Sequence, residues 1–416
     1  MNVLADPAPD VAPREYAPAP GPEERLEWQL ARAEVATWQA NRAAAEQQAA
    51  IREVLAEVRR HPEPYRVLQA EATPRDVEIA VDAAIGELAA RMSLSESVVV
   101  SLAQQAELLQ TRAPRVWAAF REGELSAANA RATGQTLASL PRHAEADALV
   151  DARALELSVL VPARFRERMR VFREKVHPVS LTERHETARD GRHVWREHHH
   201  DAMAEFGVRL GAADAELAWQ RVDAIARQLA RRADETRTLD QLRADVAADI
   251  LAGRDDPATE PRVQVGVLVP VLTLLGESQA PAMLDGRIPI DDATARRLAG
   301  SAPSFHRILT HPVSGAILDV DRTSYRPPAD LQRWLELRDG TCRSPGCGVP
   351  ARRCDLDHTQ AWAHGGSTSG RNLGHLSRRH HTRKHESRWR LDQRSDGIFT
   401  WTSPTGFTCD SDPPPF

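Results

Sequence analysis

The sequence predicts a mainly helical α+β protein, in which a long helical N-terminal region precedes a small C-terminal module of strands and helix. Apolar residues repeat at helical spacing through most of the N-terminal region. All four cysteines lie in the last fifth of the chain, beside short β-like runs. The 416 residues are enough for two or three domains with a substantial buried core.

The N-terminal region begins with a tail and continues as a helical domain. Residues 1–22 are rich in proline and alanine, which predicts a disordered tail. Residues 23–329 predict a mainly helical domain, with Ser95 and Ser126 as helix caps. The helices are expected near residues 23–59, 74–91, 95–110, 126–139, 143–157, 162–176, 212–233 and 238–252. Residues 193–210 predict two strands around a turn at Asp201, and residues 263–269 predict another strand.

The aromatic and histidine clusters of this domain have structural explanations. The adjacent residues His198, His199 and His200 would point to alternate faces of a strand, so an exposed hairpin is favoured over a metal site. Four tryptophans occupy helical core spacing, which predicts packing: Trp28, Trp38, Trp117 and Trp219. Residues 23–320 contain no pattern of side chains that predicts catalysis.

Charge is distributed unevenly along the chain. Residues 342–394 contain 11 Lys or Arg against 4 Asp or Glu, a net charge of +7. The whole chain carries −5, so the other residues sum to −12. A basic module on an acidic body indicates a polyanionic partner. On charge alone, a solvated arginine face remains an equal alternative.

The clustered cysteines and the N-terminal composition both bear on the cellular compartment. A secreted disulfide scaffold spreads its cysteines through the fold, whereas clustering favours a metal site in a reducing cytoplasm. The acidic, proline-rich N-terminus lacks the features of a signal peptide. The longest apolar run, VQVGVLVPVLTLLG, is too short to span a bilayer. We therefore expect a soluble cytoplasmic protein with no membrane association.

The cysteine-containing segment has the features of a zinc knuckle. A helix predicted from Leu331 to Arg338 leads into a tight Ser-Pro-Gly turn between Cys342 and Cys347, which can present two thiolates to zinc. His380 is a third candidate ligand. Ser377 stands three residues before it, where a cysteine would complete a C-x-x-H pair. The fourth ligand is therefore open between Cys354 and water, and we expect weak or substoichiometric zinc.

A second cluster combines an acid, a neighbouring histidine and a helix. His381 and His385 are four residues apart and share one helical face, whereas His380 is rotated by about 100°. Asp357 and His358 end a β-like run, CDLDHTQAW. A carboxylate and a helical imidazole can hold a divalent ion, and a neutral imidazole can take a proton from water. Adjacent strand residues point apart, so we expect the strand to end or bend at Asp357–His358.

These spaced elements resemble the HNH endonucleases, whose ββα-metal fold runs strand, loop, strand, helix. The matching segments are Asp357-His358, the loop with His364-Gly365-Gly366, Asn372-Leu373, His380-His381 and Lys384-His385. The upstream segments RTLDQLRADVAADIL and DRTSYRPPADLQRWLELRDGTCRSPGC resemble bacterial proteins that join a helical domain of unknown function 222 to such a nuclease. The resemblance covers residues 25–405 and implies an HNH module at 330–390, followed by a closing hairpin and tail at 391–416.

The resemblance also implies roles for individual residues. His358 matches the general base, and Asn372 matches the asparagine that fixes the loop and helps to orient the base. The implied ligands of the catalytic ion are Asp357, His381 and His385, and those of a structural Zn²⁺ are Cys342, Cys347 and His380. The ion itself is Mg²⁺, Mn²⁺ or a later transition metal. The basic residues expected to contact DNA are Arg371, Arg378, Arg379, Arg383 and Lys384.

The sequence therefore predicts a metal-dependent DNA endonuclease, with two alternatives. One is a DNA-binding protein that keeps the nuclease fold without cutting, which would not need Asp357, His358 and His381 together. The other is a structural zinc-knuckle interaction module, which would need a complete cysteine set and no base. This chain has the base and an incomplete cysteine set, so both alternatives are less favoured.

Overall fold

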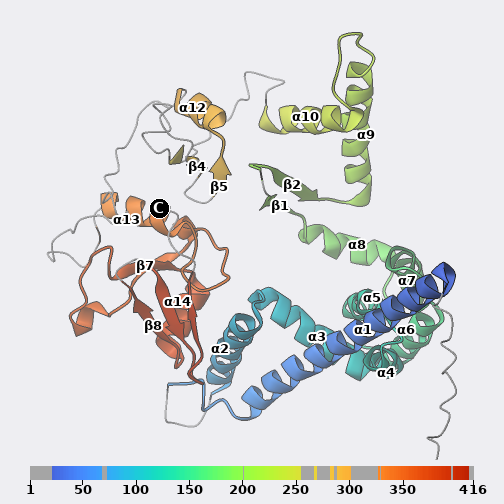
Figure 1. The fold of residues 1–416 in the computed structure, drawn as a ribbon, viewed down its shortest axis with the longest axis horizontal. Helices are drawn as coiled ribbons and strands as arrows, with labels where there is room; N and C mark the ends of the chain where they lie inside the picture. The colour runs from blue at the N-terminus through green and yellow to red at the C-terminus, as the bar shows by residue number, and fades with distance from the viewer. Residues whose placement is uncertain are drawn as a thin grey trace, which may run out of the picture. The chain divides into compact units, whose positions relative to one another are not determined.

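The protein is mainly helical, with small antiparallel sheets that lie mostly in its C-terminal half, as the sequence predicts (Figure 1). The computed structural model describes residues 21–67, 73–199, 201–253, 267–268, 282–284, 288–300, 327, 329–394 and 397–411. The chain forms two compact units, Met1–Arg52 with Ala103–His177 and Glu53–Leu102 with Pro178–Phe416. Residues 1–20 of the predicted disordered tail lie outside the described residues.

The first unit is an α-helical bundle. Its helices are the N-terminal part of α1 (Pro22–Arg60), the C-terminal part of α3 (Glu96–Arg112), α4 (Pro114–Glu122), α5 (Ala127–Ala138), α6 (Ala144–Glu156) and α7 (Pro162–Val176). All but α4 were expected from apolar periodicity. Helix α4 has only 9 residues, bounded by Pro114 at its start and a left-handed Gly123 at its end, so it is too short to show a periodic pattern.

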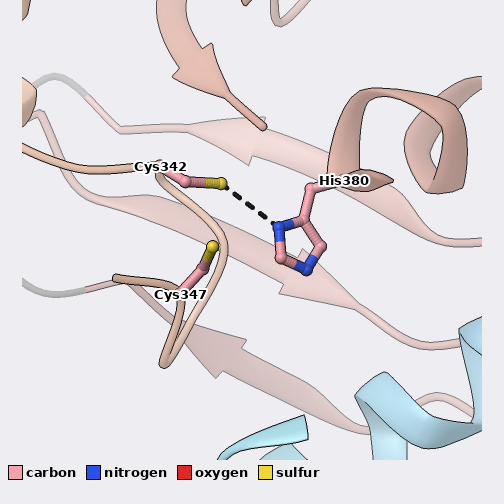
Figure 2. Close-up of side chains that lie close together, drawn as sticks. All are labelled: Cys342, Cys347 and His380. Carbon is pink, nitrogen blue, oxygen red and sulfur yellow. Dashed lines mark hydrogen bonds between the residues drawn. The ribbon is translucent and has the colours of Figure 1, made fainter. Parts of the chain in front are cut away.

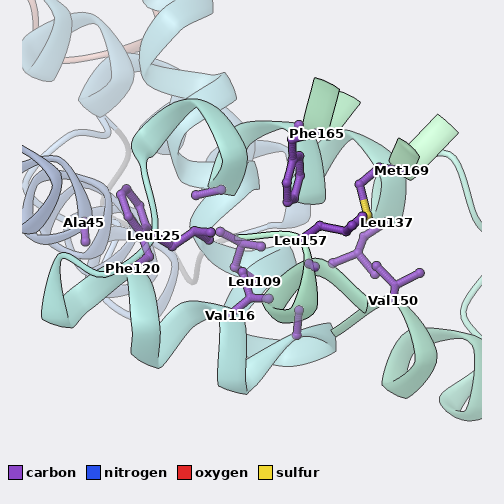
Figure 3. Close-up of a cluster of buried hydrophobic side chains, with 14 of the residues drawn as sticks. Ala45, Leu109, Val116, Phe120, Leu125, Leu137, Val150, Leu157, Phe165 and Met169 are labelled. Atoms are coloured by element: carbon purple, nitrogen blue, oxygen red, sulfur yellow. The ribbon is translucent and has the colours of Figure 1, made fainter. Parts of the chain in front are cut away.

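Apolar side chains from these helices form one buried core (Figure 3). Leu109, Val116, Phe120 and Phe165 are fully buried in it. Burying such a side chain stabilises the fold by roughly 1.5–3 kcal/mol each. The core lies wholly within the first unit and contains none of the predicted site residues.

Three of the four tryptophans predicted to pack in cores are exposed instead. Trp28 is 59% exposed, Trp38 40% and Trp219 54%. Trp117 alone packs partly buried against the first core. Helical spacing predicts that apolar residues share a face, but it does not determine whether another element covers that face. For these three residues, the core prediction was wrong.

The second unit contains the remaining elements. Its helices are the C-terminal part of α1, α2 (Pro74–Met92), the N-terminal part of α3, α8 (Leu181–Asp190), α9 (Ala212–Leu229), α10 (Leu239–Ala252), α12 (Asp292–Gly300), α13 (Ala329–Asp339) and α14 (Arg378–Glu386). Its strands are β1 (His193–His198), β2 (Ala204–Arg209), β3 (Val267–Leu268), β4 (Ala282–Leu284), β5 (Ile288–Ile290), β6 (Asp355–His358), β7 (Leu373–Leu376), β8 (Arg390–Gln393), β9 (Phe399–Thr402) and β10 (Thr408–Asp410).

Strands β1 and β2 form the predicted antiparallel hairpin, with Asp201 in its turn at a φ of 57°. At its end, the exposed side chains of Glu197, His199 and Glu205 lie close together, and His199 Nε2 is 3.4 Å from Glu205 Oε1. The hairpin was expected from the sequence, whereas the expectation that these histidines bind no metal stays a prediction, because the three side chains are close enough to hold an ion. His200 lies outside the described residues. Of the strand expected at 263–269, only β3 is described.

The C-terminal module packs a helix and two small sheets around a compact core. Leu331, Trp334 and Leu335 of α13 pack against Leu373 of β7. Strands β6 and β7 are antiparallel and β7 leads into α14, which is the predicted order of strand, loop, strand and helix. The expected closing hairpin is β8–β9, and β10 adds a third strand to it.

A buried charge network joins α13 to β7. The Asp339 carboxylate accepts hydrogen bonds from Arg338 Nε at 2.7 Å and from the backbone N–H of His375 at 2.9 Å, and it lies 2.8 Å from His375 Nδ1. Burial alone would raise the pKa of Asp339, but the neighbouring Arg338, His375 and Arg343 lower it below its usual value. Asp339 therefore stays ionised and fixes the strand that precedes the site helix.

Among the residues that the structure describes, no helix combines the length and apolar composition needed to cross a bilayer.

Candidate functional site

Helix α14 carries histidines that face two different sites. Ser377 precedes the helix in extended conformation, and nine residues follow in helical form. His380 is buried, at 3% exposure, and faces the cysteines. His381 is partly exposed and faces Asp357 at the end of β6. The rotation between neighbouring helical residues thus separates the two rings, as the doubled histidine predicts.

Asp357, His381 and His385 converge on one point. Asp357 Oδ1 is 3.5 Å from His381 Nε2 and 3.3 Å from His385 Nε2. The other carboxylate oxygen, Oδ2, contacts Lys384 Nζ. One carboxylate oxygen and two imidazole nitrogens are therefore directed at a shared position, while a lysine balances the other oxygen.

This donor set fits a divalent metal ion. Metal–ligand distances of about 2.1 Å place neighbouring ligand atoms about 3.0–3.4 Å apart in octahedral or tetrahedral coordination. The two separations between the Asp357 carboxylate and the imidazole nitrogens are within a few tenths of an ångström of that range. A mixed site of one carboxylate and two imidazoles is compatible with Mg²⁺, Mn²⁺ or a later transition metal.

His358 is the last residue of β6, which ends where the sequence predicts. Its side chain is buried, with Nε2 3.1 Å from Thr368 Oγ1 and the Trp362 ring against its edge. Burial lowers the pKa of His358, and Lys384 lowers it further, although Asp357 opposes both effects. The imidazole is therefore held neutral at pH 7, the form that can accept a proton.

Lys384, which was expected to contact DNA, lies beside the cluster of Asp357, His381 and His385. Its ammonium group contacts both the carboxylate of Asp357 and the backbone carbonyl oxygen of His358. The side chain is only 10% exposed. Lys384 therefore ties α14 to the end of β6 and fixes the acid–histidine pair in place.

Asn372 closes the loop between β6 and β7. Its Nδ2 donates to the carbonyl oxygens of Gln360 at 3.0 Å and Ser367 at 2.9 Å, and its Oδ1 accepts from Gln360 N at 2.8 Å. A Cβ on Gly366 would lie 1.9 Å from Gln360 O, so this tight crossing requires glycine. Asn372 thus fixes the loop that contains Thr368, as the resemblance implies, and is a positioning residue.

Cys342, Cys347 and His380 form a separate cluster, with their side chains pointing toward one another (Figure 2). Cys342 Sγ lies 3.2 Å from His380 Nδ1 and accepts a hydrogen bond from Ser377 N at 3.2 Å. Zinc bonds of about 2.3 Å to sulfur and 2.0 Å to nitrogen place tetrahedral ligand atoms about 3.5–3.8 Å apart. A small relaxation of this cluster would accommodate the ion.

The hydroxyl of Ser377 lies beside the cysteine cluster, with its Oγ 2.9 Å from His380 Nδ1. Cys354 lies close enough to Cys342 that their hydrogen bond lowers the pKa of the Cys354 thiol. Its Sγ is also 3.4 Å from Pro350 O. Cys354 does not join the group formed by Cys342, Cys347 and His380. In this arrangement the zinc set remains incomplete.

The remaining residues expected to contact DNA have different surroundings. Arg371 and Arg378 are exposed, and Arg378 Nε is 3.3 Å from Asp355 Oδ2. Arg379 is also exposed, but it pairs with carboxylates of the helical region. Arg383 is 3% exposed and fully engaged by such carboxylates, so it does not reach a phosphate in this conformation.

The carboxylates that engage these arginines come from α2 and α3, nearly 300 positions earlier in the chain. They are Asp82 and Glu96. Burial raises the pKa of Glu96, but hydrogen bonds from His380 and Arg383 outweigh it and hold the pKa below the usual range. Sequence reasoning missed both acids. A glycine inside an alanine-rich helix, Gly86 of α2, was the one local signal of a close approach.

Comparison with known proteins identifies the family. The family described as Domain of unknown function (DUF222) matches residues 35–339, so the chain belongs to this family. Uncharacterized protein Rv3776 of Mycobacterium tuberculosis (strain ATCC 25618 / H37Rv) is 29% identical over an alignment of 374 residues that covers 80% of this chain and 70% of that protein.

Two further relatives match a shorter part of the chain. Uncharacterized protein MT2160 of M. tuberculosis (strain CDC 1551 / Oshkosh) and Uncharacterized protein Rv2100 of strain H37Rv are each 44% identical over 90 residues. That stretch is 21% of this chain and 16% of each relative. No solved structure matches the chain.

Proposed function

We propose that this protein is a metal-dependent HNH endonuclease that hydrolyses phosphodiester bonds in DNA. The observation that carries the proposal is the convergence of Asp357 Oδ1, His381 Nε2 and His385 Nε2 within 3.5 Å contacts, next to the buried His358. Hydrolysis by an activated water requires charge stabilisation and a proton acceptor. A metal ion in the ligand cluster would supply the first, and the neutral imidazole would supply the second. The proposal places the protein in the cytoplasm, where its four free cysteines stay reduced.

In the proposed reaction, His358 takes a proton from the water that attacks the phosphorus. Lys384 and Asn372 hold the strand end and the loop, so that the imidazole keeps a constant position relative to the Asp357 carboxylate. A divalent ion bound by Asp357, His381 and His385 would supply charge stabilisation for the phosphate and the leaving oxygen. Among the residues expected to contact DNA, exposed Arg371 and Arg378 would bind the DNA backbone.

The test is a panel of metal ions with purified protein and plasmid DNA. We expect no cleavage in EDTA and restored cleavage with Mg²⁺ or Mn²⁺. The reason is that the ion held by the ligand cluster would stabilise the negative charge on the phosphate. Asp357→Ala protein, purified in parallel, controls for contaminating nucleases. DNA binding without cleavage under every metal would instead support the non-cleaving alternative.

We further propose a structural zinc site at Cys342, Cys347 and His380, weakened by Ser377. The expected state of the wild-type protein is less than one zinc per chain, because a hydroxyl is a poor ligand beside two thiolates. Burial and the neighbouring Cys342 raise the pKa of Cys347 to about 12, with the hydrogen bond to Cys342 the larger cause. Zinc binding must therefore displace protons, and occupancy should rise with pH.

Replacing Ser377 with cysteine should complete the site. Ser377 Oγ makes no capping bond to α14 and points at His380, so a thiol there meets the ion without removing a helix cap. Each tenfold gain in zinc affinity should add up to about 1.4 kcal/mol to the free energy of unfolding at saturating zinc. Zinc content and thermal unfolding measure the change.

Ser377→Ala is the matched control, since it removes the hydroxyl without adding a thiolate. It should leave zinc content near that of the wild-type protein. One tightly bound zinc per wild-type chain would contradict the prediction and would indicate that Cys354 or another group completes the site.

A further inference from the structure

His380 connects the cysteine cluster to the helical region. Its Nδ1 is 3.2 Å from Cys342 Sγ, and its Nε2 is 3.3 Å from Oε1 of Glu96, the first residue of α3. The ring is buried and the Glu96 side chain is 15% exposed, so water has little access to this contact. The two nitrogens of one imidazole are thus assigned to two different partners.

We propose that Glu96 is a positioning residue for the cysteine–histidine metal site. By accepting the Nε2–H of His380, the carboxylate holds the tautomer whose Nδ1 lone pair faces Cys342 and Cys347. Histidine ligands commonly donate their second N–H to a carboxylate, which fixes the ring and strengthens its basicity. Glu96 lies inside the segment that matches the DUF222 family, whereas His380 lies beyond it. The family domain therefore contributes to the metal site of the C-terminal module.

Glu96 is held in place by two arginines of α14, the helix that carries His380. Arg383 Nη1 contacts Glu96 Oε1, and Arg379 Nη1 is 2.9 Å from Glu96 Oε2. As a residue of the first turn of α3, Glu96 is also favoured by the helix dipole. The Glu96 carboxylate thus has one preferred position. It must be fixed in this way if it is to hold His380 in one tautomer.

Helix α2 leaves space for the Arg383 side chain of α14. A Cβ on Gly86 would lie 2.3 Å from Arg383 Nη1, so glycine leaves the space that the guanidinium occupies. Asp82 Oδ2 accepts from Arg383 Nη2 at 2.9 Å, and the carbonyl oxygen of Ala83 accepts from Trp389 Nε1 at 3.1 Å. These contacts hold α14 and Trp389 against α2, which precedes α3 in the chain. Glycine is less favourable than alanine inside a helix, so the close approach offsets a local penalty.

The inference rests on the zinc site proposed above and is independent of DNA cleavage. Its test measures Zn²⁺ affinity of the full chain by competition with a chromogenic chelator, and the ligand-field spectrum of the Co²⁺ form. We expect Glu96→Ala to weaken Zn²⁺ binding by about 10–100-fold, as loss of an outer carboxylate partner does in other sites. Glu96→Gln keeps an acceptor oxygen and should recover part of the loss.

Two control variants separate orientation of His380 from general docking. Asp82→Asn also removes a carboxylate from Arg379 and Arg383 but does not touch His380, so it should keep the wild-type Zn²⁺ affinity and Co²⁺ spectrum. Glu78→Gln changes an exposed acid of α2 and should have no effect. Thermal unfolding of each metal-free protein checks the fold.

Each outcome decides the proposal. A Co²⁺ spectrum altered by the Glu96 variants alone, with the expected loss of affinity, supports it. Unchanged affinity and spectrum in Glu96→Ala, or an equal loss in Asp82→Asn, overturns the positioning role while leaving the zinc site intact. If the wild-type protein binds Zn²⁺ and Co²⁺ no better than a Cys342→Ser variant does, both the zinc site and this inference are overturned. That outcome would not bear on the nuclease proposal.

Discussion

A His358→Ala protein should cleave DNA about 10²–10⁴-fold more slowly than the wild type, the usual cost of losing a general base. His358 is held neutral by burial at the end of β6, and it is the imidazole adjacent to the Asp357 ligand. His358 does not belong to the group of possible metal ligands formed by Asp357, His381 and His385. Metal binding and DNA binding should therefore persist. Single-turnover cleavage with saturating metal measures the effect.

The base and the metal ligands should respond differently to added reagents. Excess Mn²⁺ should partly restore Asp357→Ala and His381→Ala, which weaken the ion, but not His358→Ala. Added imidazole should partly restore His358→Ala, because it supplies the missing proton acceptor. His364→Ala, at an exposed histidine of the same loop, is the matched control. Wild-type cleavage by His358→Ala would overturn the mechanism, and an unfolded variant would favour a structural role.

An Asp339→Asn protein should lose about 3–5 kcal/mol in free energy of unfolding of the C-terminal module, since removing one partner of a buried ion pair leaves the other charge uncompensated. Asp339 is 1% exposed, and its carboxylate holds Arg338 and the backbone and ring of His375. Urea unfolding followed by tryptophan fluorescence measures the change, since three of the nine tryptophans, Trp334, Trp389 and Trp401, are buried in this module. Asp392→Asn, at an exposed acid of β8, is the control.

The stability contributed by Asp339 should also depend on pH in a defined direction. Its pKa is lower in the folded protein than in the unfolded chain, where an aspartate titrates near about 3.9. The contribution is therefore fully present above about pH 4 and decreases as the pH falls through the folded-state pKa. The difference in unfolding free energy between wild type and Asp339→Asn should be constant near neutral pH and shrink below about pH 4. A difference that grows on acidification would contradict this assignment.

Features that depend on short stretches of chain were predictable from the sequence. The i, i+4 spacing of His381 and His385, the turn between Cys342 and Cys347 and the strand end at Asp357–His358 all appear as expected. The β1–β2 hairpin with Asp201 in its turn does too. Each follows from the 3.6-residue period of a helix, the two-residue period of a strand or a local turn, and these depend on neighbouring residues alone.

Only the tertiary structure decided which charges and apolar faces find partners. Arg383 and Lys384 were expected to bind DNA because they are basic residues of a basic helix, yet one is buried against Asp82 and Glu96 and the other holds Asp357. Glu96 and His380 are 284 positions apart, and no local pattern links them. Helical spacing likewise placed Trp28 on an apolar face that stays exposed. A periodic pattern states which side chains share a face, whereas the partner of that face depends on how distant elements pack, and this is determined by the folded chain as a whole.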